Sequence, residues 1–128
     1  MPVKIETVQT NGVCFVGSGD LTGEDLYEAN RKIYLTDDLI RKYDFQILNF
    51  LNVESLNVSY EMLEKMTAQD KRAYKVNPNI KIVCVADKEN IFNIMKMWES
   101  FVTAESFEIK VVKTFEEAFE WLGIQERV

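Results

Sequence analysis

Histidine is absent from this chain of 128 residues. Histidine is the commonest general base and metal ligand near neutral pH, so its absence excludes the Ser-His and Cys-His hydrolase designs. A zinc site is excluded on the same ground. We therefore expect no metal. No motif in the chain demands a particular chemistry, so we assign no cofactor and no catalytic residue.

Cysteine and long apolar runs are also scarce. The two cysteines, Cys14 and Cys84, stand inside apolar segments with no CxxC pattern, so we expect reduced, buried and inert thiols. No apolar run approaches the roughly 18 residues that a membrane-spanning helix needs. The first ten residues do not resemble a signal peptide. These absences predict a cytoplasmic protein.

Positive charge is in the minority, with 15 basic against 21 acidic side chains and a net charge of −6. This balance argues against a nucleic-acid partner and against an anionic membrane surface, because both require a basic face. Apolar residues make up 47% of the chain, which is typical of a globular protein. We expect one domain over residues 1–128.

Apolar patterning predicts five strands. The second, third and fourth are apolar on both faces and belong inside a sheet, whereas the first and fifth alternate with polar residues, as edge strands do. Asn11-Gly12 predicts a hairpin turn between the first two strands, because both positions tolerate positive φ. The five strands are expected at residues 3–8, 13–17, 45–51, 80–86 and 107–112.

A helix is expected after each of the last four strands. Thr22 with Asp25, Ser59, Asp87 and Thr114 stand at the starts of these helices and predict their N-caps. The order is β-β-α-β-α-β-α-β-α, an α/β fold in which an N-terminal hairpin precedes parallel βα units. Right-handed crossovers then place helices on both faces of a mixed sheet.

This order resembles the STAS domain and, more closely, the bacterial SpoIIAA-like proteins, which are related to the lipid-binding CRAL-TRIO fold. The segments that carry the resemblance are DLTGEDL, DKRAYKVNPNIKIVCVA and FNIMKMWESF, together with the strand, turn and Ser59-capped helix in the middle of the chain. It implies a non-catalytic module that acts by protein–protein contact, as a homodimer.

STAS anti-sigma-factor antagonists carry an Asp-Ser-Ser-Gly turn whose second serine is phosphorylated. That turn falls on Asn57-Val58-Ser59-Tyr60, where only Ser59 matches. The resemblance therefore implies a phosphosite or partner contact at Ser59 and Asn57, although the bulky Tyr60 should hinder docking of the usual kinase. The alternative is that Ser59 is a plain helix cap.

Polar residues follow the predicted strands at the carboxyl edge of the sheet, where ligands bind in open α/β folds. We expect Asp20, Thr22, Asp87 and Thr114 at this edge. The alternative is that each caps the helix that follows it. A third function, an enzyme that works through Asp20, Asp70 or Asp87, stays open at this point.

Asp70 falls at helical spacing on or beside an apolar face, with Lys71, Arg72 and Lys75 near it in sequence. It is either part of a partly buried salt bridge or an acid that contacts a ligand.

Methionine and aromatic side chains gather on the helices that follow the third and fourth strands. They are either ordinary core or a pocket for a small apolar, lipid-like ligand, as the lipid-binding relatives imply. One of them lies off the main apolar stripe of its helix and, if exposed, would favour self-association. That residue is Met97, and the others are Met62, Met66, Phe92, Met95, Trp98 and Phe101.

Overall fold

A computed structural model describes residues 2–104 and 106–125. Its centre is a five-stranded sheet in the order β1-β2-β3-β4-β5, in which β1 is antiparallel to β2 and the other neighbours are parallel. The predicted fold class is therefore confirmed, with β1 and β5 at the edges. The strands are β1 (Val3–Val8), β2 (Gly12–Thr22), β3 (Phe45–Asn57), β4 (Lys81–Val85) and β5 (Glu108–Val112).

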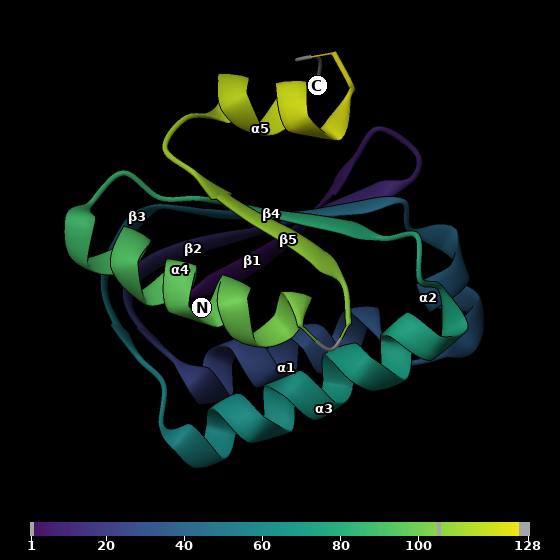
Figure 1. The fold of residues 1–128 in the computed structure, drawn as a ribbon, viewed down its shortest axis with the longest axis horizontal. Helices are drawn as coiled ribbons and strands as arrows, with labels where there is room; N and C mark the ends of the chain where they lie inside the picture. Colours follow the sequence, from purple (N-terminus) through teal and green to yellow (C-terminus); the bar gives the residue numbers. More distant parts are fainter. Residues whose placement is uncertain (1, 105, 126–128) are drawn as a thin grey trace.

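Helices lie on both faces of the sheet, but unequally. The strands follow one another in chain order, so crossovers of one hand place their helices on the same face. That face carries α1, α3 and α4, while α5 alone covers the other (Figure 1). The helices are α1 (Gly23–Ile33), α2 (Asp37–Lys42), α3 (Tyr60–Val76), α4 (Glu89–Thr103) and α5 (Phe115–Leu122).

The two faces of the sheet bury two apolar clusters of unequal size. The larger cluster lies beneath α1, α3 and α4 and includes Phe15, Leu48 and Ile82 from the strands. The smaller one lies beneath α5 and includes Ile47 and Val83 from the strands with Phe119 from the helix. Strands that are apolar on both faces, as predicted, are the consequence of this double cover.

Strands β2 and β3 are longer than the apolar patterning predicted, since β2 continues beyond Gly17 and β3 beyond Leu51. The extensions pair with each other, past the ends of β4 and β5. Asn57 therefore belongs to β3 and not to the predicted turn. Buried Leu21 and Val53 alternate with exposed polar residues along these extensions, which is the period of a half-buried strand.

Three of the four predicted N-caps are confirmed. Thr22 forms a capping box with Asp25, and the backbone N–H groups of Met62 and Glu117 donate to the hydroxyls of Ser59 and Thr114. The prediction for Asp87 is wrong, because α4 begins one residue later. Its N-cap is Lys88, which makes no side-chain capping bond.

The hairpin between β1 and β2 forms where Asn11-Gly12 predicted it, but for another reason. The residue with positive φ is Gln9, at 57°, and neither Asn11 nor Gly12 has that conformation. Gly12 is required by packing, because a Cβ atom there would lie 2.1 Å from Cζ of Phe45.

Replacing Gly12 with alanine should therefore destabilise the protein by about 1–3 kcal/mol, the usual cost of overpacking. Urea unfolding of Gly12→Ala measures this loss. In a Phe45→Leu background the ring is gone and the alanine should cost much less. An equal cost in both backgrounds would contradict the packing explanation.

Candidate ligand pocket

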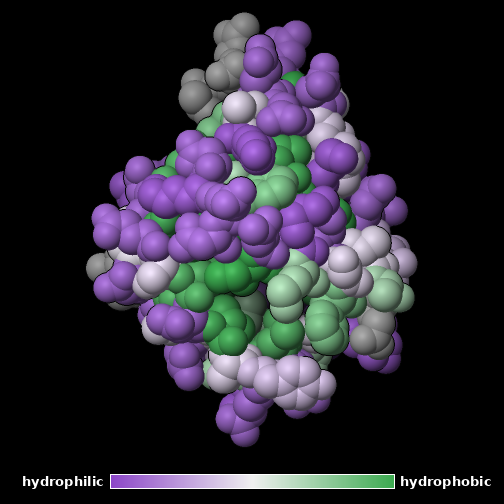
Figure 2. Space-filling view, turned by 60° about the vertical axis from the view of Figure 1, so that its left-hand side comes forward, coloured by the Kyte–Doolittle hydropathy of each residue, from purple (hydrophilic) through white to green (hydrophobic). Residues whose placement is uncertain are grey.

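A pocket of about 130 Å³ lies between α3 and α4, above the sheet. Its floor comes from β2, β3 and β4 and its walls from α3, α4 and, at one side, α1. Figure 2 shows a hollow surrounded by hydrophobic side chains on this side of the molecule. Residues that line it include Phe15, Gln46, Leu48 and Ile82 from the strands, Leu26 and Asn30 from α1, Leu63, Met66 and Asp70 from α3, and Ile94, Met95, Met97, Trp98 and Phe101 from α4.

The position of α3 is fixed by polar contacts with α1. The Asn30 amide donates to the Gln69 side chain at 3.2 Å, and the Gln69 amide donates to the backbone carbonyl of Tyr27 at 3.1 Å. Further along the helix, the guanidinium group of Arg72 donates to the carbonyl of Tyr34 at 2.9 Å. These bonds hold α3 against α1, on the side away from α4.

Helix α4 is held by strand β5, at the edge of the sheet. The carboxylate of Glu99 accepts a hydrogen bond from the backbone N–H of Val111 at 3.1 Å and pairs with Lys96 at 2.8 Å. Val102, from the same helix, is fully buried. With α3 held by α1 and α4 held by β5, the space above β3 and β4 between them is not closed by helix packing.

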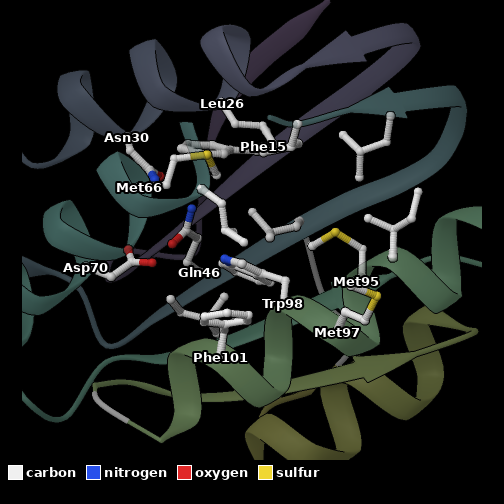
Figure 3. Close-up of a pocket in the computed structure, with 16 residues that line it drawn as sticks. Phe15, Leu26, Asn30, Gln46, Met66, Asp70, Met95, Met97, Trp98 and Phe101 are labelled. Atoms are coloured by element: carbon white, nitrogen blue, oxygen red, sulfur yellow. The ribbon is translucent and has the colours of Figure 1, made fainter. Parts of the chain in front are cut away.

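One end of this otherwise apolar pocket is polar. Asp70 is 2% exposed, and its Oδ1 accepts a hydrogen bond from the Tyr34 hydroxyl at 3.3 Å, while its Oδ2 has no partner. The indole Nε1 of Trp98, a residue that is 9% exposed, has no partner either. Figure 3 shows both groups directed toward the buried side chain of Gln46. Unsatisfied buried polar atoms are rare and are candidates for ligand contacts.

Burial controls the ionisation of this end of the pocket. Loss of hydration raises the pKa of Asp70 from 3.8 to about 7, against the opposing effect of the Tyr34 hydrogen bond. The pKa of Tyr34 is raised well above its usual value, first by burial and then by the nearby Asp70. The Asp70 carboxyl group therefore titrates near neutrality, and its bonding neighbour is a hydroxyl and not a cation.

Most of the predicted methionine and aromatic cluster lines the pocket: Met66, Met95, Met97, Trp98 and Phe101. Met62 lies instead against Gly23, and the Phe92 ring has Lys113 Nζ 5.1 Å from its centroid. Sequence reasoning missed Gln46 and Asn30, which also line the pocket. The available signal was a polar residue inside an apolar strand or stripe.

The expected residues at the carboxyl edge of the sheet lie at two levels. Strand β4 ends at Val85, which pairs with Asn49 of β3, and β5 ends beside Val85, so Asp87 and Thr114 follow at this level. Strand β2 ends at Thr22, opposite Asn57 at the far end of β3. Asp20, within β2, accepts a hydrogen bond from the Ser55 hydroxyl at 2.7 Å. Thr22 and Thr114 cap helices and Asp20 bonds the neighbouring strand, so these residues do not form one common site.

The described residues contain little reactive chemistry elsewhere. Both cysteines are buried and free, and burial raises the pKa of the Cys14 thiol to about 11 and that of Cys84 still further. Within 2–104 and 106–125, no group of three or more His, Cys, Asp and Glu side chains is placed to hold a metal ion. No helix in these ranges is long and apolar enough to cross a membrane.

Sequence comparison finds no family model and no curated protein that matches the chain. Comparison of structures does find matches. The phosphorylated form of SpoIIAA, a Bacillus cell fate determinant, aligns at 13% identity with a TM-score of 0.60, covering 94% of this chain and 98% of that one. The unphosphorylated form, described as an anti-sigma factor antagonist, aligns at 13% identity with a TM-score of 0.59, covering 94% and 97%.

The chain has the SpoIIAA-like fold. An uncharacterised protein from Shewanella loihica, described with the same fold, aligns at 18% identity with a TM-score of 0.58, covering 94% of this chain and 91% of that one. Within this SpoIIAA-like fold, Ser59 is exposed and stands between the end of β3 and the start of α3. Its hydroxyl accepts from the Met62 N–H at 3.1 Å, which is the geometry of a helix cap.

The raised pKa of Asp70 predicts a pH dependence of stability. Between pH 3.8 and about 7 the unfolded chain ionises this carboxyl while the folded chain keeps it protonated. The unfolded state then binds fewer protons, so the free energy of unfolding should fall as pH rises through this window, and level off above it. The measurement is urea unfolding of the protein and of Asp70→Asn at several pH values.

The difference in free energy of unfolding between the protein and Asp70→Asn removes the effect of the other carboxyl groups. This difference should fall by at least about 1 kcal/mol across the window, since one pKa unit corresponds to about 1.4 kcal/mol. A difference that rises with pH would show that Asp70 is ionised and stabilised in the fold.

The capping bond of Ser59 is tested by two substitutions. Ser59→Ala removes the acceptor for the Met62 N–H and should cost about 1 kcal/mol of stability, whereas Ser59→Asp supplies another good cap and should cost little. Thermal unfolding compares the two. Equal stability of Ser59→Ala and the unmodified protein would exclude a capping role.

Proposed function

We propose that this protein is a non-catalytic cytoplasmic module that regulates a process by contact with a protein partner. The SpoIIAA-like fold supports this, because one of the aligned structures is described as an anti-sigma factor antagonist.

The observation that carries this proposal is an exposed apolar stripe on α4, formed by Ile94, Met97 and Phe101. Their exposed fractions are 37%, 69% and 45%, and their spacing places them on one face of the helix. Exposed apolar side chains that gather on one face, rather than singly, mark contact sites. We propose that a second copy of the chain packs on this α4 stripe to form a homodimer.

A second function, binding of a small, largely apolar molecule, is supported by the pocket. A concave apolar site with a few convergent polar groups is typical of ligand sites. The three residues of the α4 stripe also line the pocket. A bound molecule would therefore contact the same side chains as a protein partner, and ligand and partner would influence each other's binding.

Ser59 and Asn57 are a proposed place of regulation. Ser59 is exposed at the N-terminus of α3, where the helix dipole favours negative charge. A phosphate on Ser59 would keep an oxygen available to the Met62 N–H while adding negative charge to the exposed N-terminus of α3. Tyr60, which is exposed beside it, is the side chain that a kinase would have to accommodate.

The homodimer is tested by placing a charge on the α4 stripe. Met97→Glu should weaken self-association at least about tenfold, because a carboxylate would lose its hydration at the interface. Sedimentation velocity over a range of protein concentrations measures the dissociation constant. Leu35→Glu is the matched control, since Leu35 is an exposed apolar residue outside the stripe.

The control variant should associate as the unmodified protein does. A protein that stays monomeric at every concentration would reject the homodimer. Equal weakening by Leu35→Glu and Met97→Glu would place the interface elsewhere.

A further inference from the structure

The polar end of the pocket defines the kind of molecule that would fill it, provided that the second proposed function is correct. Two buried groups there lack a hydrogen-bond partner, and they have opposite requirements. In its ionised form, Asp70 carries an oxygen, Oδ2, that needs a donor, whereas the Trp98 indole N–H needs an acceptor. Both residues are more than nine-tenths buried, so water does not reach them freely.

The remaining lining is apolar and limits the size of the molecule. The pocket holds about 130 Å³. An apolar cavity of about 150 Å³ in another protein binds benzene. A single ring or a short chain therefore fits the inner space, and its polar group would lie at the end where Asp70, Gln46 and Trp98 meet (Figure 3).

Charge distinguishes among the polar groups that such a molecule could carry. An ammonium group would pair with Asp70 but would leave the Trp98 N–H without an acceptor. A carboxylate would accept from Trp98 but would place a second negative charge beside Asp70. A hydroxyl group donates and accepts at one atom and carries no charge.

We propose that the pocket selects a small uncharged amphiphile whose hydroxyl group donates a hydrogen bond to Asp70 and accepts one from the indole N–H of Trp98. The buried amide of Gln46 is directed at the same place and can either donate a hydrogen bond to the hydroxyl or accept one from it. The ring or chain of the ligand contacts Met66, Met95 and Ile82. The site is thus specific for the polar group and tolerant of the apolar body.

Four probes of nearly equal shape test this proposal: 2-phenylethanol, 2-phenylethylamine, phenylacetate and ethylbenzene. The chain has two tryptophans, so a ¹⁵N-labelled sample gives two indole N–H signals, from Trp98 and Trp121. Trp121 lies on α5, on the other face of the sheet, and serves as the internal reference. Titration with 2-phenylethanol at pH 8, where Asp70 is ionised, should shift the Trp98 signal and leave the Trp121 signal in place.

The alcohol should bind at least about fivefold more tightly than ethylbenzene, in line with one or two added hydrogen bonds, and more tightly than either charged probe. Trp98→Phe keeps an aromatic ring but removes the N–H. It should lower the affinity for 2-phenylethanol about fivefold, as measured by ligand-observed NMR, and leave that for ethylbenzene nearly unchanged. Trp121→Phe is the matched control and should change neither affinity.

Two results would overturn the proposal. If no probe shifts the Trp98 signal up to its limit of solubility, the pocket is not a site for small molecules of this kind. If ethylbenzene or the amine binds as tightly as the alcohol, the hydroxyl assignment is wrong. Sedimentation velocity of Trp98→Phe tests the two functions separately. The variant should self-associate as the unmodified protein does, because the α4 stripe does not require the indole N–H.

Discussion

The hydrogen bond between Tyr34 and Asp70 is the constraint on which the polar end of the pocket depends. It joins the end of α1 to the middle of α3 at 3.3 Å, inside the protein, and uses one carboxyl oxygen of Asp70. The second oxygen stays unsatisfied at the end of an apolar space. A buried carboxyl with an unmet hydrogen bond costs free energy, so its presence in a well-packed domain favours a role beyond stability.

The pocket follows from a division of contacts among the helices. Amide and guanidinium groups bind α3 to α1, and Glu99 binds α4 to the backbone of β5. Neither helix is then free to move over the centre of the sheet. The same geometry leaves Ile94, Met97 and Phe101 partly exposed, so the contact surface and the pocket share one set of side chains.

Much of this fold could be predicted from local sequence patterns. Apolar runs placed all five strands, and Thr22, Ser59 and Thr114 marked three helix starts, because caps and strand faces depend on residues close in sequence. The ends of β2 and β3 were not predictable in the same way, since their last residues pair only with each other. The role of Gly12 depends on Phe45, a residue far along the chain.

Only part of the candidate site could be predicted, again because local patterns do not reveal contacts between residues far apart in the sequence. Met66, Met95 and Trp98 fall on apolar helix faces, but whether two such faces enclose a core or a pocket depends on how the helices are held apart. That Asp70 bonds Tyr34 rather than one of the basic residues beside it in sequence is a tertiary fact. The proximity of Gln46, from β3, to Trp98, from α4, likewise depends on the tertiary structure.

A carbon-13 NMR titration of the Asp70 side-chain carboxyl group tests the central claim most directly, because it measures the ionisation of that group in the folded protein. A carboxyl buried at the polar end of the pocket, with one oxygen unsatisfied, should titrate with a midpoint of about 7. A midpoint near the ordinary value of 3.8 would show that Asp70 is hydrated or paired with a cation, and would contradict the account.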